Sequence, residues 1–292
     1  MEIALQLLIN GLLVGGIYAL ISTGLTLVFG VMRIINFAHG EFLMISMYMV
    51  YWLNVKLGMD PYLAMIVIIP VMFLIGILIY QTTLNPIVGK QDLLTILMTV
   101  GVMIFLQNIA LMLWNADVRS ISIPYGTKTL GTNMIRVGVT RLASFAVAIG
   151  TAIGLLALLD KTWIGKSIKA TSQNCDAAKL MGVDTKKTFM IAFGIGTATV
   201  GVAGAALAPI FSIFPTIGQQ FGTISFVVVV LGGLGSVPGA VFGGLIIGMV
   251  STFSSFLLPT GYTEAVYLAI FLLVLLFRPN GLLGKAKAGG GR

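Results

Sequence analysis

The feature that most constrains this chain is a series of apolar runs, each close to the length of a membrane-crossing helix. A helix needs about 20 apolar residues to cross the ~30 Å hydrocarbon core of a bilayer. The sequence therefore predicts an all-α, polytopic transmembrane helix bundle of about 8–9 spans, forming a single domain over residues 1–292. The expected apolar segments are 3–29, 42–55, 62–84, 93–114, 142–159, 188–211, 223–231, 240–258 and 262–277.

Composition agrees with a membrane protein. Hydrophobic residues make up 58% of the chain and charged residues only 9%, whereas a soluble domain carries roughly a quarter charged residues. The net charge of +8 is concentrated in a few loops, which membrane orientation explains better than binding of nucleic acid. The single cysteine, Cys175, has no companion for a disulfide or a metal site, and we expect neither.

Small residues indicate where helices pack closely. The 188–211 segment is rich in glycine and should be central in the bundle. Four glycine pairs with small-residue spacing predict further close contacts: Gly11/Gly15, Gly150/Gly154, Gly239/Gly243 and Gly244/Gly248.

Two interruptions divide the apolar pattern, one near 30–41 and one near 223–239. Irregular backbone at membrane depth is tolerated where protein or water covers it, as in the broken helices of transporters. We therefore expect broken or re-entrant helices at both places. The second interruption holds the helix-break glycines Gly232, Gly233, Gly235 and Gly239.

Polar residues inside the apolar regions are the candidates for a pathway or gate. Asn36, His39 and Glu41 could form a gate, or they could cap and tie down a helix start, which is the interpretation that we favour. One histidine and one glutamate make a poor metal site. Asn10 in the first segment and Gln107 in the fourth are the other pathway candidates.

The most basic interior segment, residues 160–187, holds six lysines against three acids. If it faces the cytoplasm, parity places 30–41, 81–92 and the basic tail 278–292 on the same side, with 12 of the 17 Lys and Arg residues. The bias predicts a periplasmic N-terminus and a cytoplasmic C-terminus. The four basic residues of 115–141 oppose this orientation, because they would lie on the periplasmic side. This segment is predicted to form a hairpin or an interfacial helix.

A short helix is expected inside this basic segment, from about Cys175 to Met181. Ser172 or Asn174 would cap its start and Gly182 would end it. Its small apolar face fits a groove on another protein, whereas its lysines suit lipid headgroups, and the residues alone leave both interpretations open. That face would consist of Ala177, Ala178 and Met181.

The sequence shows neither a nucleotide-binding loop nor a set of intramembrane acids that could supply energy for transport. Gly165-Lys166-Ser167 imitates the end of a nucleotide-binding loop, but Asp160 stands where the first glycine is required. Apart from Glu264, no acid lies in the middle of a span, unlike in ion-coupled pumps. The sequence therefore predicts a protein that is not an enzyme and is either passive or driven by a partner.

Three motifs together resemble one family. They are Asn36-Phe-Ala-His-Gly-Glu41, the segment from Gly165-Lys-Ser-Ile-Lys-Ala170 to Ala177-Ala-Lys-Leu-Met-Gly-Val183, and Leu231-Gly-Gly-Leu-Gly-Ser-Val-Pro-Gly-Ala240. They resemble the permeases of bacterial ABC importers for branched-chain amino acids, in the H-type form. Lys166 and Lys169 stand where that family often has arginine.

The resemblance implies a multi-pass protein of the inner membrane that forms a heterodimer with an M-type permease. It implies two cytoplasmic ATPase subunits that hold ATP and Mg, and a periplasmic amino-acid-binding protein, with no cofactor on this chain. It also implies that the basic segment couples to an ATPase through Gly165, Lys166, Lys169, Ala177, Ala178, Leu180, Met181, Gly182 and Asp184.

Two alternatives remain at this level. Urea and amide permeases share much of this motif pattern, so the motifs do not distinguish a branched-chain amino acid from urea or an amide as the substrate. A stand-alone channel or facilitator is an alternative of a different class, and it predicts substrate flux through this chain without ATP or partners.

Overall fold

The computed structural model describes residues 2–131, 136–259 and 261–284, and helices dominate them. Its helices are α1 (Glu2–Met32), α2 (His39–Leu57), α3 (Pro61–Ile79), the π-helical turn η1 (Tyr80–Leu84), α4 (Asp92–Trp114), α5 (Val139–Lys161), α6 (Trp163–Gln173), α7 (Cys175–Leu180), α8 (Thr185–Leu207), α9 (Ile217–Gly232), α10 (Val237–Leu257) and α11 (Tyr262–Phe277). Most of the predicted basic tail, residues 285–292, lies outside the described residues.

Six helices of the described chain are long and apolar enough to cross a membrane. They are Glu2–Met32, Pro61–Leu84, Leu93–Trp114, Val139–Lys161, Thr185–Leu207 and Val237–Leu257. Two further apolar helices, α9 and α11, have 16 residues each. The all-α polytopic bundle is as predicted, and the expected number of 8–9 spans is not confirmed.

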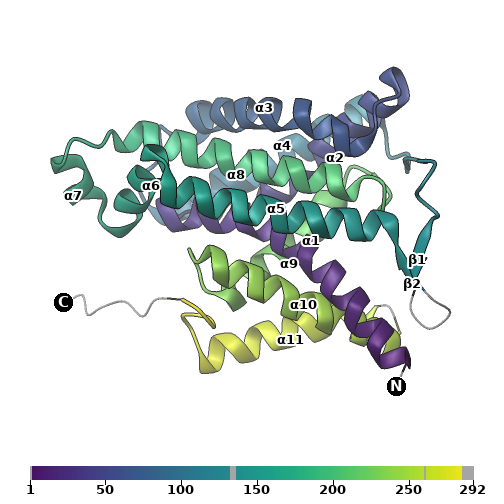
Figure 1. The fold of residues 1–292 in the computed structure, drawn as a ribbon. Coiled ribbons are helices and arrows are strands. Elements are labelled where there is room, and N and C mark those ends of the chain that lie inside the picture. Colours follow the sequence, from purple (N-terminus) through teal and green to yellow (C-terminus); the bar gives the residue numbers. More distant parts are fainter. Residues whose placement is uncertain (1, 132–135, 260, 285–292) are drawn as a thin grey trace.

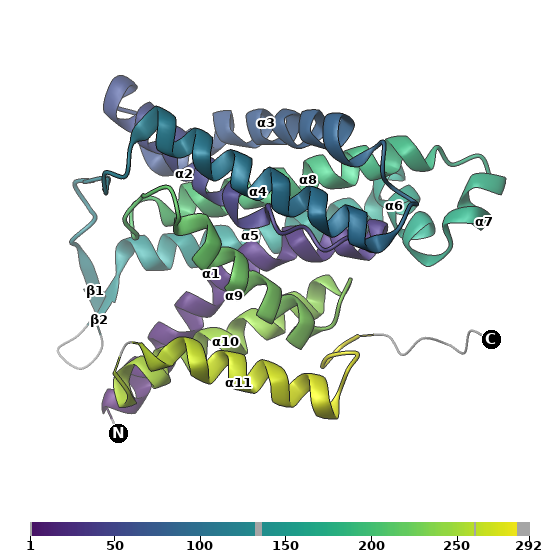
Figure 2. The ribbon, with the colours of Figure 1, turned by 180° about the vertical axis from the view of Figure 1, so that it is seen from behind.

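The bundle is built around α1 and α8, which are mostly buried. Figures 1 and 2 show α2, α3 and α4 on one side of this centre and α9, α10 and α11 on the other. Helix α8 packs closely because it is rich in small residues: Gly204 lies against Ser46 of α2. The Ser46 hydroxyl donates a hydrogen bond to the Gly201 carbonyl at 2.7 Å. The prediction that this segment is central is confirmed.

The close helix contacts predicted at the glycine pairs are confirmed in α1 and α10 but not in α5. A methyl group on Gly15 would lie 2.7 Å from the Cα atom of Leu245, because α1 and α10 touch backbone to backbone there. By contrast, Gly150 and Gly154 are exposed and would meet nothing within 4 Å. The predicted close contact at this pair is wrong within this chain, because both residues face away from the bundle.

The first predicted interruption is a real break in the helical chain. Helix α1 ends at Met32, and the connection turns back so that α2 begins at His39 against the Ile21 carbonyl of α1. Ile21 lies eleven residues before Met32, which is about 16 Å along a helix. Helix α2 therefore starts inside the bundle.

The second interruption differs from its prediction in position. Helix α9 begins at Ile217, six residues before the expected apolar run, and its first turn lies against Gly40 of α2. The glycine string instead forms the turn between α9 and α10, where Gly233 and Gly235 adopt positive φ angles of 107° and 83°. The internal helix start is therefore at 217, and the glycines serve a tight connection.

The connections of the bundle gather at two opposite ends. The N-terminal part of α1 lies beside the hairpin of β1 (Thr129–Gly131) and β2 (Arg136–Gly138), because Gln6 exchanges two hydrogen bonds with the Arg136 backbone. This hairpin is one of the two structures expected for 115–141, and its tip, 132–135, lies outside the described residues. Helices α6 and α7 lie at the other end (Figure 1).

Candidate functional site

Two helix starts meet inside the bundle, and glycine makes the meeting possible. Gly40, in the first turn of α2, lies against the backbone of Gly218 and near Gly222 in the first turns of α9. A side chain on Gly40 would overlap the Gly218 carbonyl oxygen. We refer to this contact between the first turns of α2 and α9 as the half-helix junction.

Glu41 lies at the half-helix junction and is only 1% exposed. One carboxylate oxygen, Oε1, accepts a hydrogen bond of 2.9 Å from the side-chain amide of Gln107 in α4. The other, Oε2, has no hydrogen-bond partner and faces Gly218, where an added methyl group would lie 2.7 Å away. The structure thus brings together two of the predicted pathway candidates, Glu41 and Gln107.

His39 and Asn36 hold the first turn of α2 in place. The ring nitrogen Nε2 of His39 donates a hydrogen bond to the Ile21 carbonyl oxygen at 2.9 Å. The side-chain oxygen of Asn36 accepts one from the Ala38 amide at 3.1 Å. Asn10 is not part of this group, because it lies eleven residues before Ile21 on α1, about 16 Å away.

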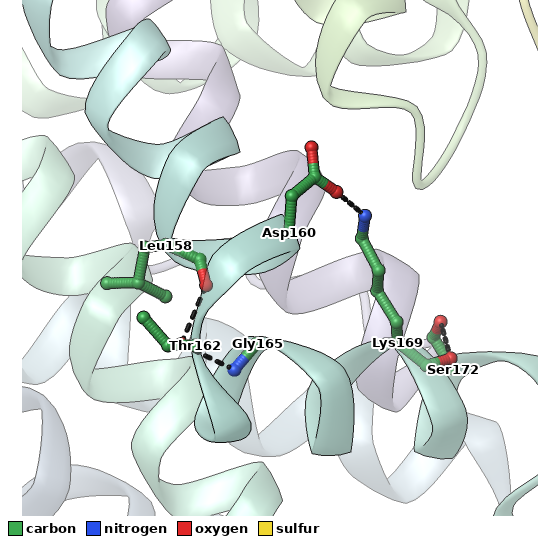
Figure 3. A network of polar contacts seen from close by, with 6 residues as sticks. All are labelled: Leu158, Asp160, Thr162, Gly165, Lys169 and Ser172. Carbon is green, nitrogen blue, oxygen red and sulfur yellow. Dashed lines mark hydrogen bonds and ion pairs between the residues drawn. The ribbon is translucent and has the colours of Figure 1, made fainter.

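A second region of interest is the joint between α5 and α6, shown in Figure 3. The Thr162 hydroxyl donates to the Leu158 carbonyl at 2.7 Å and accepts from the Gly165 amide at 3.0 Å, so that it caps α6. Gly165 is buried against the backbone of the last turn of α5, which leaves no room for a side chain. Lys169 of α6 forms an ion pair with Asp160 of α5. These contacts fix the direction in which α6 leaves the bundle.

Helix α7 begins at Cys175 as the sequence predicts and ends at Leu180, one residue before the predicted end. The Asn174 side chain accepts hydrogen bonds from the amides of Asp176 and Ala177 at 3.1 and 3.0 Å. Gly182 follows the helix with a φ of 84°, a conformation that favours glycine. Ser172, the other predicted cap, instead donates to the Lys169 carbonyl.

Charged side chains surround α7. A hydrogen bond from Lys179 to Asp176 raises the pKa of the lysine. The Asp184 side chain caps α8 by accepting a hydrogen bond from the Lys187 amide, which lowers the pKa of Asp184. Both groups keep their charges at neutral pH, and the surface around α7 stays polar.

Three large apolar side chains are exposed in this region: Trp163 at the start of α6, Leu180 at the end of α7 and Met181 directly after α7. Leu180 is 88% exposed, Met181 84% and Trp163 79%. The structure buries two residues of the predicted coupling set, Gly165 and Ala178, the latter to 5% exposure. Lys166, Lys169, Ala177, Gly182 and Asp184 are exposed.

Sequence reasoning missed Trp163. It opens an amphipathic helix directly after a membrane-length run, and an aromatic residue at that position is typical of a membrane interface or a docking surface.

A cleft of about 370 Å³ separates the α6–α7 unit from the end of α1. Its walls include Arg33 just after α1, Thr171 of α6 and Phe189 of α8. Arg33 adopts a φ of 56°, which places it where the connection from α1 turns back toward the half-helix junction. The cleft therefore lies between the exposed helix pair and the segment that leads to α2.

Membrane-length helices, two helices that begin inside the bundle and an exposed pair of short helices at one end together define a multi-pass membrane transport protein. The chain belongs to the family described as branched-chain amino acid transport system / permease component, which it matches over residues 7–275.

Curated relatives resemble the chain over almost its whole length. A high-affinity branched-chain amino acid transport system permease protein, BraD of Pseudomonas aeruginosa, is 33% identical, with 96% of each chain covered. The corresponding LivH protein of Escherichia coli K12 is also 33% identical, again with 96% of each chain covered. A probable LivH of Methanocaldococcus jannaschii is 27% identical over 96% of this chain and 92% of the relative. No solved structure matches the chain.

Proposed function

We propose that this chain is the H-type permease subunit of an ATP-driven importer that carries branched-chain amino acids across the inner membrane. The observation that carries the proposal is full-length similarity to permeases named for that transport system, together with family membership over residues 7–275. The structure adds an exposed surface on which an energy-supplying partner could dock.

That surface is the end of α7, where Leu180 and Met181 are exposed, with Trp163 also exposed at the start of α6. Three large apolar side chains on a short, capped helix pair suit a groove on another protein. We infer that an ATPase subunit docks here, and that the exposed lysines Lys166 and Lys169 contribute charge at its rim. ATP and Mg would be held by that partner and not by this chain.

Orientation follows from the same docking. Helices α6 and α7 lie at the end of the bundle opposite the hairpin (Figure 1). If an ATPase docks on them, their end is cytoplasmic and the hairpin end, with the N-terminal part of α1, is periplasmic. The distribution of lysine and arginine supports this orientation.

The remaining partners follow from this arrangement. An M-type permease would complete a heterodimer within the bilayer, and a second ATPase would dock on it. A periplasmic binding protein would deliver the amino acid at the hairpin end, near residues 115–141 and 212–222. The half-helix junction, with Asn36, His39, Glu41 and Gln107, would then lie between the point of delivery and the docking surface, and Asn10 would line the outer part of α1.

In this mechanism the ATPases close on ATP and move the docked α6–α7 unit. Because α6 is fixed to α5 by the Thr162 cap and the Lys169–Asp160 ion pair, the movement passes into the bundle as a rigid displacement. The pathway then changes from outward to inward access.

The docking proposal is tested by the double substitution Leu180→Asp and Met181→Asp in the complete transporter. We expect loss of ATPase association and of leucine uptake, because charged side chains replace the exposed apolar face. Leu283→Asp is the matched control, since Leu283 is also exposed and lies after α11, away from α7. Normal association in the double variant would contradict docking at this surface.

The substrate class is tested by competition in the same vesicles. Leucine, isoleucine and valine should each inhibit uptake of labelled leucine, and urea or acetamide should not. Equal competition by urea would contradict the assignment to branched-chain amino acids.

A further inference from the structure

The cleft between the end of α1, the α6–α7 unit and α8 combines two kinds of wall. Its volume of about 370 Å³ lies within the usual range of small-molecule sites, roughly 300–1,000 Å³. One side consists of Val31, Met32 and Phe189, which we call the apolar wall, and the other of residues 171–176 with Arg33. Apolar walls with a few polar groups are typical of sites that bind small molecules.

One cation and one acid line this cleft, and they come from different elements. Arg33, just after α1, is exposed and forms no ion pair with any residue that the structure describes. Asp176, in the first turn of α7, pairs with Lys179 at 3.3 Å, and its side chain is 89% exposed. Neither charge is buried in a closed network, so both are accessible to a ligand that carries a carboxylate and an ammonium group.

Thr171 of α6 supplies an independent sign of a ligand. It lines the cleft, it is 2% exposed, and its hydroxyl has no hydrogen-bond partner in the described part of the chain. A helical threonine commonly donates to the carbonyl four residues earlier, as Thr151 and Thr199 do here. A buried hydroxyl without a partner is costly. A molecule in the cleft with an acceptor oxygen would remove that cost.

We propose that this cleft binds a free amino acid with an apolar side chain. Arg33 and the Thr171 hydroxyl bind its carboxylate, Asp176 binds its ammonium group, and its side chain lies on the apolar wall. The proposal rests on the proposed function for the identity of the ligand, because leucine, isoleucine and valine have both charges and an apolar side chain. It goes beyond that function, because it adds a second amino-acid site, outside the translocation pathway.

A ligand in this cleft would act on transport through its position. It would join Arg33, in the connection from α1 to α2, to Asp176 of α7. The proposed mechanism moves the α6–α7 unit, and a ligand stabilises the conformation to which it binds. In the proposed orientation the cleft faces the cytoplasm, so the imported amino acid would slow its own import once it has accumulated.

Cys175 gives a direct measure of occupancy. It lines the cleft, is half-buried, and is the only cysteine in the sequence. The purified full-length chain in detergent is treated with N-ethylmaleimide, with and without leucine, and the labelled fraction is followed by mass spectrometry. Leucine at ten times its dissociation constant leaves about one cleft in eleven free, so labelling should slow about tenfold.

The choice of ligand tests each contact. Isoleucine and valine should protect Cys175 as leucine does. Isoamylamine lacks the carboxylate, isocaproate lacks the ammonium group and glycine lacks the apolar side chain, so each should protect weakly. Phosphoethanolamine carries the two charges of a lipid headgroup. Protection by phosphoethanolamine and not by leucine would identify a lipid site and overturn the proposal.

Two variants test the residues of the cleft. Thr171→Val keeps the shape of the side chain and removes the unpartnered hydroxyl, so the melting temperature should not fall, whereas leucine should protect Cys175 less. Arg33→Asn removes the cation, and asparagine tolerates the positive φ of 56° at this position. Ser167→Ala and Lys90→Asn, which change residues outside the cleft, are the matched controls. Undiminished protection in either cleft variant would contradict the site.

Import is measured separately, so that the site and the proposed function can fail independently. Vesicles with the complete transporter contain ATP, with or without unlabelled leucine, and binding protein with labelled leucine is added outside. Internal leucine should slow initial uptake about fivefold, the lower end of usual coupling between sites, and Arg33→Asn should remove this effect. If the wild type imports no leucine, the proposed function fails, and protection of Cys175 still decides the site. If it imports equally with and without internal leucine, the feedback is wrong and the proposed function stands.

Discussion

Gly40 in α2 and Gly218 in α9 lie backbone to backbone, at a point where both helices have just begun. This contact joins two segments that are far apart in the sequence. It also sets the position of Glu41, because the carboxylate of the next residue in α2 reaches the first turn of α9.

Gly40→Ala should destabilise the chain, because the added methyl group overlaps the Gly218 carbonyl oxygen. Overpacking of this kind costs about 1–3 kcal/mol, and the melting temperature of the purified complex in detergent should fall. Gly101→Ala is the matched control, since a methyl group there meets nothing within 4 Å. Equal melting temperatures for the two variants would show that the junction is not tightly packed.

His39→Phe should loosen the start of α2. The substitution keeps an aromatic ring but removes the nitrogen that donates to the Ile21 carbonyl oxygen. Loss of a buried hydrogen bond costs about 1–3 kcal/mol, which thermal unfolding in detergent would detect. Asn10→Ala, on the same helix as Ile21 but away from the junction, should change the melting temperature little. If the two variants melt alike, His39 does not fasten α2 to α1.

Asn174→Ala should weaken ATPase association without affecting assembly in the membrane. Its side chain caps a six-residue helix through two amides, and loss of such a cap costs about 1 kcal/mol. Asn174→Asp keeps the cap and should associate normally. Co-purification of the ATPase with each variant measures the difference, and equal losses in both would point to a role of the amide other than capping.

Arg119→Ala should loosen the segment that precedes the hairpin. Arg119 lies over the rings of Tyr51 and Trp52, at 5.3 and 5.2 Å from their centroids, and its backbone pairs with Ile213. Loss of the cation–π contacts should speed tryptic cleavage at the exposed Lys128 by about fivefold. Arg119→Lys retains a cation and should be cleaved more slowly than the alanine variant. Unchanged cleavage would mean that the backbone pair alone holds the segment.

Long apolar helices were predictable from the sequence because their boundaries follow from hydropathy. The observed range of α11, Tyr262–Phe277, matches its predicted range, and α4 begins at Asp92, one residue before its predicted start. The cap and stop of α7 were also predictable, since Asn174 and Gly182 are local signals. In each case the determining chemistry lies within a few neighbouring residues.

The start of α9 could not be predicted in the same way. Pro215 and Gly218 indicate a connection, whereas the helix begins between them, with Gly218 packed against Gly40 of α2. That contact joins positions far apart in the chain. For the same reason, nothing in the local pattern distinguishes Gly150, which faces outward, from Gly15, which touches α10.

The pairing of Glu41 with Gln107 is another long-range relationship. Each residue was a pathway candidate because a polar side chain inside an apolar helix needs a partner. Which residue partners which depends on how α2 and α4 pack, and only the structure shows it.

We propose that partner subunits drive transport through this chain. Uptake of labelled leucine is measured in vesicles that contain this chain with the proposed M-type permease, ATPases and binding protein, with and without ATP. Vesicles that contain this chain alone are the comparison. We predict accumulation only with the full set and ATP. Leucine flux through this chain alone, without ATP, would show that it is a stand-alone channel or facilitator and not a subunit driven by partners.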